Sequence, residues 1–264
     1  MPKQKPSSKK DLPPRQSQQQ TQQQQPPNWP PLRPLIPSSD LLLDPLLPDQ
    51  IYLIRNFLPS TLCKTYVSFL SSLPLTTTPG KPKKGDAVRV NDRFQIQDAA
   101  FAERLWRETA LKDLVTNPNP NPDWDLDAAT EDEQQQTISA KGIWGGEPLG
   151  LNSNIRVYRY SPGQFFAQHY DDSNTLSFLS PSAPPKPART TWTLLIYLST
   201  CTGGETVFYP EATRTNRNPE PVAVAPEMGM ALLHRHGDRC LLHEGKEVAN
   251  GEKWVLRSDL VVAR

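Results

Sequence analysis

The fold is decided by IRVYRY (155–160), FFAQHYD (165–171), TWTLLIYLS (191–199) and KWVLRSDLVV (253–262). These segments are short and rich in β-branched and aromatic residues, which is typical of strands. Shorter runs of the same kind lie between them: ETVFY (205–209), VAVA (222–225) and MALLH (230–234). The turn signals SPG, TGG, PEMG and NG separate the runs. Many short strands without intervening helices predict a jelly roll, or double-stranded β-helix, of about eight strands.

Upstream of this region the pattern changes to mixed strand and helix. IYLIRNFL (51–58) alternates as a strand does, and Ser60 or Thr61 is placed to cap a following helix. A second helix is predicted from Asp98 to about Leu111. The fold class expected is therefore α+β. Residues 49–264 form one domain, with N-terminal helical support over 49–115 and a jelly-roll core over about 150–264. Loops are expected at 117–140, which is polar and acidic, and at 180–190, which is rich in proline.

Residues 1–48 differ in composition from the rest of the chain. They are rich in proline and contain a glutamine run, Gln16–Gln25, that only Ser17 and Thr21 interrupt. Such a segment has too little apolar surface to offset the entropy of ordering. We therefore expect a disordered tail, which could recruit protein partners through its proline-rich part.

Size and charge exclude several classes of protein. The chain has 264 residues, a net charge of +1 and three cysteines. No apolar run approaches the roughly 20 residues that span a bilayer, and the N-terminus has no apolar secretory signal. The near-neutral balance disfavours a nucleic-acid partner. The odd, widely spaced cysteines indicate a reducing compartment, so we expect a cytoplasmic or nuclear protein without membrane contact.

Three residues have the pattern of a metal site. His169 and Asp171 lie two apart, so both side chains face one side of a strand. His243 opens a later segment that a jelly roll can place beside the first. Two imidazoles and one carboxylate form a facial triad that suits Fe(II) and, less distinctively, Zn(II) or Mn(II). His234 and His236 are rival ligands at this stage.

The segments around the triad resemble the prolyl 4-hydroxylase-like Fe(II)/2-oxoglutarate-dependent dioxygenases. The resemblance rests on YRYSPGQFFAQHYDD (158–172), LLIYLSTCTGGETVFYPE (194–211) and HEGKEVANGEKWVLRSD (243–259), in this order. It implies that His169, Asp171 and His243 bind Fe(II), and that no side-chain general base is needed. It also implies 2-oxoglutarate and O2 as co-substrates, L-ascorbate as a helper, and hydroxylation with succinate and CO2 as co-products.

The resemblance also assigns the 2-oxoglutarate pocket. Lys253, ten residues after His243, matches the family lysine that pairs with the 5-carboxylate. Arg257 lies on the same strand face and is the alternative anchor. Its planar guanidinium could bind a carboxylate through two hydrogen bonds, whereas the lysine ammonium is a compact charge. Tyr160 and Tyr197 match pocket tyrosines, although without the resemblance both read as core aromatics. Phe166 stands where related enzymes often carry tyrosine.

The primary substrate is not specified, and a protein side chain or a small molecule both remain open. Arg89, Asn91 and Arg93 alternate on one face of the segment 88–98 and are candidate substrate contacts, or simply charges on an edge strand. Two other functions stay open: a nucleic-acid oxygenase of the same fold, and an inactive metal-binding scaffold that recruits partners through the tail. A zinc hydrolase would need Glu244 as its base, and this side chain should point to the other strand face.

Overall fold

The computed structural model describes the following residues: 25–78, 82, 85, 87–118, 140–180, 183–214 and 216–264. Residues 1–24 and most of the predicted loop 117–140 lie outside them. Within the described residues, no helix is long and apolar enough to span a membrane.

The largest sheet has ten strands, and its pairs are antiparallel. Its main order is β1-β2-β14-β10-β17-β7-β5-β3, while β6 pairs with β17 and β9 pairs with β10. These strands are β1 (Asp44–Leu47), β2 (Ile51–Ile54), β3 (Thr76–Thr77), β5 (Asp92–Gln97), β6 (Pro148–Leu151), β7 (Asn154–Tyr160), β9 (Thr175–Ser180), β10 (Ala183–Tyr197), β14 (Ala231–Arg235) and β17 (Lys253–Ala263).

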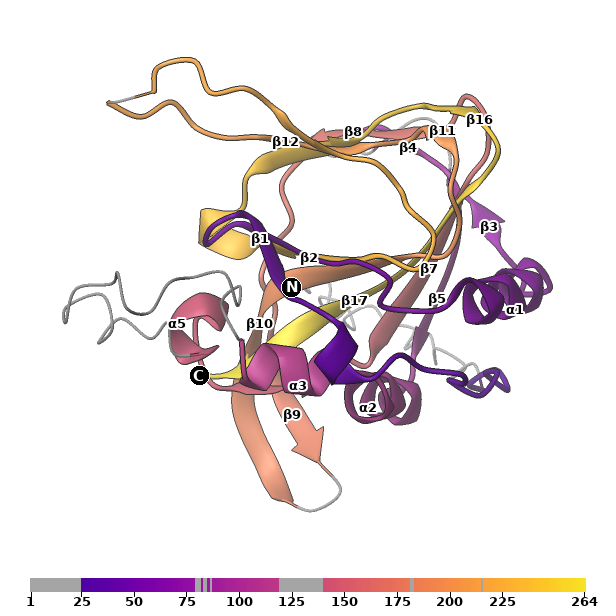
Figure 1. The fold of residues 1–264 in the computed structure, drawn as a ribbon, viewed down its shortest axis with the longest axis vertical. Helices are drawn as coiled ribbons and strands as arrows, with labels where there is room; N and C mark the ends of the chain where they lie inside the picture. Colours follow the sequence, from indigo (N-terminus) through magenta and orange to yellow (C-terminus); the bar gives the residue numbers. More distant parts are fainter. Residues whose placement is uncertain are drawn as a thin grey trace, which may run out of the picture.

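A second antiparallel sheet has five strands in the order β13-β12-β15-β8-β4. They are β4 (Arg89–Val90), β8 (Phe165–His169), β12 (Thr206–Tyr209), β13 (Val222–Val224) and β15 (Leu242–Gly245). A two-stranded ribbon joins β11 (Thr202–Gly203) to β16 (Val248–Asn250). Figure 1 shows β4, β8 and β12 of this second sheet above β2, β17 and β10 of the first.

The described helices are few and gather on one side. They are α1 (Ser60–Ser71), α2 (Ala99–Glu108), α3 (Leu111–Thr116) and α5 (Ala140–Trp144), with 3-10 turns η1 (Ser38–Asp40) and η2 (Gly237–Arg239). Figure 1 shows α1, α2 and α3 beside the ten-stranded sheet, on the side away from the five-stranded sheet. The prediction of an α+β fold is therefore confirmed, and its large sheets are antiparallel.

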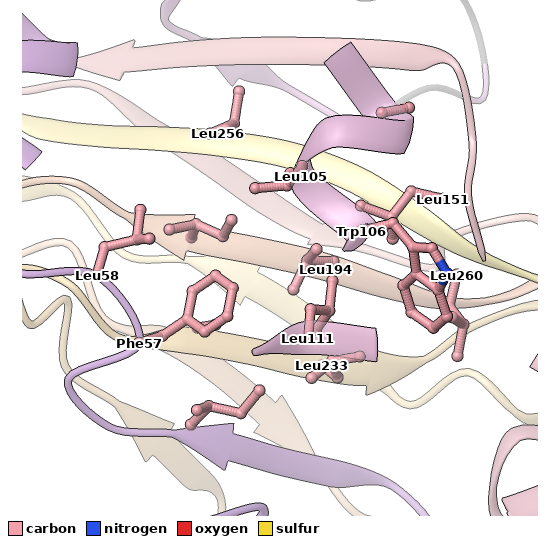
Figure 2. Close-up of a cluster of buried hydrophobic side chains, with 14 of the residues drawn as sticks. Phe57, Leu58, Leu105, Trp106, Leu111, Leu151, Leu194, Leu233, Leu256 and Leu260 are labelled. Carbon is pink, nitrogen blue, oxygen red and sulfur yellow. The ribbon is translucent and has the colours of Figure 1, made fainter. Parts of the chain in front are cut away.

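The core has two layers because strands of the large sheet are buried on both faces. On β17, Trp254 and Leu256 belong to the cluster shared with the helices, whereas Val255 belongs to the cluster between the sheets. This is the period-two alternation of a strand. Figure 2 shows the helix-side layer, in which Leu105 and Trp106 of α2 lie among leucines of the sheet.

The predicted cap of α1 was wrong, whereas α2 begins beside Asp98, where the second helix was expected to start. The N-cap of α1 is Pro59, which makes no side-chain cap bond, so Ser60 is already helical. Asp98 precedes α2, and its Oδ1 accepts a hydrogen bond from the backbone N–H of Phe101 at 2.9 Å. A carboxylate at this position satisfies an otherwise unpaired donor of the first turn.

The boundary of the predicted tail needs a correction, because residues 25–48 contain part of the core. Trp29 is 7% exposed and Leu32 is 1% exposed. The indole of Trp29 stacks on Phe101 with ring centroids 4.0 Å apart, and its Nε1 donates to Asp98 Oδ2 at 2.8 Å. Averaged composition hides such anchors, since a few large apolar side chains can hold a proline-rich segment against a helix surface.

The loop predicted over 180–190 is also corrected. Most of it belongs to β10, which pairs with β9 and β17. The pairing with β9 is irregular between Ala183 and Lys186, so Pro184 and Pro185 fall at the register shift. Prolines lack the N–H that a ladder needs and are tolerated in strands at such irregularities.

Candidate metal centre and adjoining cavities

The two histidines of the predicted triad lie directly opposite each other on paired strands. His169 ends β8, His243 lies in β15, and the two residues are register partners. Asp171 follows β8 by two residues. Its Oδ1 lies 3.9 Å from His169 Nε2 and its Oδ2 lies 3.8 Å from His243 Nε2. One ligand atom from each of the three residues lies within 4.8 Å of the others.

Both histidines are held in the tautomer that a metal needs. His169 Nδ1 lies 2.8 Å from the carbonyl of Ala167, and His243 Nδ1 lies 2.9 Å from the carbonyl of Leu241. Because a carbonyl oxygen only accepts hydrogen bonds, each Nδ1 carries the proton and each Nε2 keeps a free lone pair. Burial lowers the pKa of His169 to about 4 and also lowers the pKa of His243. Both rings are therefore neutral near pH 7.

Asp171 is ionised despite its burial. Burial alone would raise the pKa of its carboxyl, but Arg257 first, and then His234, His243 and His169, hold that pKa well below the usual range. Arg257 Nη2 lies 2.9 Å from Asp171 Oδ2, which also accepts a hydrogen bond from Thr193 Oγ1 at 2.9 Å. Two donors thus orient Oδ2, while Oδ1 faces His169.

The structure distinguishes between His234 and His236, the two alternative metal ligands. The two ring nitrogens of His236 lie 3.0 Å from Thr193 Oγ1 and 2.9 Å from Thr190 Oγ1, so this ring is committed to hydrogen bonds. His234 lies closer to the centre, with Nε2 3.7 Å from Asp171 Oδ2. It can also be grouped with Cys240 and His243.

That second grouping is chemically the weaker one. Burial raises the pKa of the Cys240 thiol to about 11, although the backbone N–H of Asp171 opposes this rise. A metal bound by this grouping would have to displace the thiol proton, since metals bind the thiolate. His169, Asp171 and His243 need no proton removed from a side chain, so this donor set fits a divalent metal better.

Lys253 occupies a buried position on the inner face of β17. Its Nζ donates to the carbonyl of Gly204 at 2.7 Å and to Thr206 Oγ1 at 3.3 Å, and it lies over the rings of Tyr160 and Tyr197 at 5.7 and 5.4 Å. Burial lowers the pKa of Lys253 to about 8, although Cys201 and Glu205 oppose this. Among the described residues, no carboxylate lies within ion-pair distance of Lys253.

A cavity of about 50 Å³ is lined by Lys253 and by the three residues of the triad. Tyr160 and Thr206 also line it. Tyr197 does not, but its hydroxyl lies 2.8 Å from Thr206 Oγ1, so it reaches the cavity through that threonine. Thr193 was not among the predicted site residues. Its hydrogen bond to Asp171 comes from a distant strand, so it is not visible in a linear motif.

A larger cleft of about 1150 Å³ opens beside the triad and shares His169, Asp171 and Arg257 with the small cavity. Of the predicted substrate contacts, Arg89 and Arg93 line this cleft. Asn91 does not: it is fully buried, and its Oδ1 accepts a hydrogen bond from Thr78 Oγ1. The chain passes from the five-stranded to the ten-stranded sheet at Asn91, so the three side chains do not share one face.

Glu244 also borders the small cavity, but its carboxylate is committed to hydrogen bonds. Its Oε1 accepts hydrogen bonds from the hydroxyl of Tyr209 and from Lys246 Nζ. Such a carboxylate is a poor general base, which removes the support for a zinc hydrolase.

Comparison with known proteins agrees with this site. Residues 155–258 match the family model of the 2OG-Fe(II) oxygenase superfamily, and this segment contains the triad, Lys253 and Arg257. The resemblance seen in the sequence motifs is thereby confirmed at the level of the superfamily. Enzymes of this superfamily use Fe(II) and 2-oxoglutarate and are typically oxidoreductases. No curated protein matches the chain.

Several solved structures are similar to this one. A prolyl-4-hydroxylase from Pseudomonas putida is 14% identical with a TM-score of 0.47, over 81% of this chain and 94% of that chain. A prolyl hydroxylase from Trichoplax adhaerens, in complex with a hypoxia inducible factor peptide fragment, is 16% identical with a TM-score of 0.49, over 84% and 88%. The viral collagen prolyl hydroxylase of Paramecium Bursaria Chlorella virus-1 is 16% identical with a TM-score of 0.44, over 81% and 97%. At these identities the similarity concerns the fold alone.

Proposed function

We propose that this protein is an Fe(II)- and 2-oxoglutarate-dependent dioxygenase that hydroxylates a C–H bond of a protein side chain or a small molecule. One observation carries the proposal: a two-histidine, one-carboxylate cluster lines the same cavity as a buried lysine that has no carboxylate partner among the described residues. The balanced reaction consumes substrate, 2-oxoglutarate and O2, and yields hydroxylated substrate, succinate and CO2. The two sheets are the facing layers that a double-stranded β-helix requires.

In this proposal His169, Asp171 and His243 hold the iron. Their donor set of two neutral imidazoles and one carboxylate suits Fe(II) and leaves positions open for other ligands. Fe(II) in such a site, together with 2-oxoglutarate and O2, supplies the oxidising power for an unactivated C–H bond. The chain supplies orientation, and it needs no general base among its side chains. L-ascorbate would serve as an auxiliary reductant.

Lys253, and not Arg257, is proposed to bind the 5-carboxylate of 2-oxoglutarate. Arg257 already pairs with Asp171 and also lies 3.6 Å from Asp259, so its charge is balanced within the protein. Lys253 has no such partner among the described residues, and burial disfavours its charge until an anion arrives. Tyr160 and Thr206 line the same cavity and would support that carboxylate.

Three further features belong to the proposal. The protein is located in the cytoplasm or the nucleus. Residues 1–24 bind protein partners. The catalytic domain consists of residues 49–264 together with the anchoring part of 25–48. The scaffold alternative receives no specific support from the site, because the predicted ligand set is complete and lines one cavity with Lys253. The net charge of +1 does not favour the nucleic-acid alternative.

The decisive experiment is succinate formation from 2-oxoglutarate by the purified protein with Fe(II), ascorbate and air. Many oxygenases of this kind turn over slowly without their primary substrate, so succinate is expected at a low rate. His169→Ala, Asp171→Ala and His243→Ala should each abolish it, because two ligands do not hold the metal in a productive geometry. Retained activity in any one of them would disprove the ligand assignment.

If the wild-type protein forms no succinate, 2-oxoglutarate binding to the anaerobic Fe(II) protein decides between two explanations. Binding without turnover means that the primary substrate must trigger O2 activation. No binding would favour an inactive scaffold.

A further inference from the structure

The large cleft beside the triad is lined by several arginine side chains. Among the described residues, the basic side chains lining it are Arg89, Arg93, Arg156 and Arg257. The acidic residues that line it, within the same described part of the chain, are Asp171, which is paired with Arg257, and Asp172, which is exposed. The cleft is therefore cationic next to the proposed site of oxidation.

Two of these arginines are already neutralised inside the protein. Arg257 pairs with Asp171, and Arg156 pairs with the buried Asp259. Arg89 and Arg93 have no carboxylate partner within 4 Å among the described residues. Arg93 Nη2 makes only a long contact of 3.4 Å with Gln95 Oε1. Both side chains are partly buried, so their guanidinium groups gain most from an anion that enters the cleft.

Arg89 is held at a defined place relative to the triad. Its guanidinium carbon lies 4.8 Å from the ring centroid of Phe166 and 5.6 Å from that of Tyr158. Phe166 in turn stacks on His169 with centroids 3.5 Å apart and an interplanar angle of 19°. Phe166 thus contacts both the guanidinium of Arg89 and the ring of a proposed metal ligand. An anion bound by Arg89 would therefore lie near the proposed oxidising centre.

The dimensions and lining of the cleft indicate an extended substrate. A volume of about 1150 Å³ exceeds the roughly 300–1,000 Å³ of ordinary small-molecule pockets. Side-chain amides also line it, from Gln95, Asn154, Gln168 and Asn174. An amide offers both donors and an acceptor, which suits the alternating groups of a peptide backbone.

The small number of unpaired arginines in the cleft suits the carboxylates of a peptide better than the phosphates of a nucleic acid. A strand of nucleic acid carries a phosphate at every nucleotide and is bound by a positively charged groove that follows it. The described part of the cleft offers two unpaired arginines, and the whole chain has a net charge of only +1. Two such sites match one or two acidic side chains of a peptide.

We propose that the cleft binds an acidic peptide segment of a protein substrate, with Arg89 and Arg93 as the residues that recognise its carboxylates. This rests on the proposed dioxygenase function for the claim that the bound segment is then hydroxylated. Binding of the peptide itself does not depend on that chemistry.

The test is fluorescence anisotropy of fluorescein-labelled hexaglutamate with the full-length protein. Saturable binding is expected, with unlabelled hexaglutamine competing at least about tenfold more weakly because it lacks the charges. Arg89→Gln combined with Arg93→Gln should weaken hexaglutamate binding by about tenfold or more. Arg107→Gln is the matched control, since Arg107 is an exposed arginine of α2 that does not line the cleft. It should bind hexaglutamate as the wild-type protein does.

Further variants keep the result interpretable if the double variant is unstable. Arg89→Lys retains the charge but not the planar stacking and should lose less affinity than Arg89→Gln. Arg93→Glu should weaken hexaglutamate binding more than Arg93→Gln does. Equal binding of hexaglutamate and hexaglutamine, or full binding by the double variant, would overturn the proposal.

Two more probes separate the competing occupants. A twelve-nucleotide oligothymidylate that binds more tightly than hexaglutamate, with a steep loss of affinity in salt, would replace the peptide with a single-stranded nucleic acid. Inorganic phosphate that competes as well as hexaglutamate at equal concentration would show a simple anion site and overturn the peptide assignment.

Failure of this inference and failure of the proposed function give different results. If 2-oxoglutarate binds the wild-type Fe(II) protein but hexaglutamate does not, the cleft assignment is wrong and the oxygenase proposal stands. If hexaglutamate binds through Arg89 and Arg93 but 2-oxoglutarate does not bind, the protein is an acidic-peptide receptor without this chemistry.

Discussion

At the scale of single residues, Lys253 is the most informative side chain. It is 5% exposed and bonds only to uncharged oxygens, those of Gly204 and Thr206, among the described residues. Burying a lysine in this way disfavours its charged form, and its pKa falls to about 8. A carboxylate that enters the cavity would supply the missing counter-charge and favour the ammonium form.

The affinity for 2-oxoglutarate should therefore depend on pH in the alkaline range. The bound anion stabilises charged Lys253, so its pKa is higher in the complex than in the free protein. Affinity should be constant below about pH 8 and fall above it, by up to about tenfold per pH unit, until the pKa of the complex is reached. Calorimetric titration of the anaerobic Mn(II)-loaded protein with 2-oxoglutarate measures this. Lys253→Met should bind much more weakly and without this slope.

Lys246→Met provides the control, because Lys246 is exposed and already paired with Glu244. It should keep both the affinity and the slope of the wild-type protein. An unchanged slope in Lys253→Met would show that another group titrates, and Arg257→Met would then be the variant to examine for the anchor.

The triad could be predicted at this scale because its spacing reflects local geometry. His169 and Asp171 lie two apart on one strand, and a short motif contains that information. Thr193 could not be found in this way. It meets Asp171 from a distant strand, and the placement of that strand is a property of the folded sheet. Asn91 was placed wrongly because the chain changes sheets at that residue.

At the scale of elements, the N-terminal segment behaves as part of the domain. Leu32 is 1% exposed and joins the cluster that also contains Trp29 and Phe101. Leu32→Ala should lower the free energy of unfolding by about 2–5 kcal/mol, since it leaves a cavity in a packed core. Urea unfolding followed by tryptophan fluorescence measures this change.

Leu42 offers a matched comparison in the same segment, since 55% of its surface is exposed. Leu42→Ala should change the free energy of unfolding by no more than about 0.5 kcal/mol. Deletion of residues 1–45 should be strongly destabilising, because it removes Trp29, Leu32, Leu41 and Leu43 together. A deletion that left the unfolding midpoint unchanged would restore the original view of a tail that ends at residue 48.

Strands and helices differed in how well the sequence predicted them. The strands carrying the motifs and the helices around Tyr66 and Leu105 were predicted because their apolar residues repeat with the period of the element. The long strand β10 was predicted only from Thr191 onward. Its first half contains three prolines, and partners on both sides, β9 and β17, stabilise it in spite of them.

At the scale of the whole molecule, the three residues of the candidate metal centre are positioned by both sheets. His169 and His243 belong to the five-stranded sheet. Asp171 is held by Arg257 of β17 and Thr193 of β10, which belong to the ten-stranded sheet. A metal bound by all three residues would therefore connect the sheets, and its binding energy would stabilise the entire fold.

Binding of a divalent metal should consequently raise the melting temperature of the protein. A ligand that binds only the native state stabilises it by about 2.7 kcal/mol at a concentration of one hundred times its Kd. Mn(II) is a convenient probe because it accepts the same ligands as Fe(II) without oxidising in air. Differential scanning fluorimetry of EDTA-treated protein should show a rise on adding Mn(II), and the rise should disappear in His169→Ala.

Cys240→Ala makes this measurement discriminate between the two groupings of ligands. If His169, Asp171 and His243 hold the metal, Cys240→Ala lowers the starting melting temperature but keeps the rise with Mn(II). If His234, Cys240 and His243 hold it, the rise disappears in Cys240→Ala and persists in His169→Ala. Only the grouping of His169, Asp171 and His243 includes Asp171, which residues of the ten-stranded sheet hold in place. A rise that depends on His169 but not on Cys240 is thus the result expected of a centre built by both sheets.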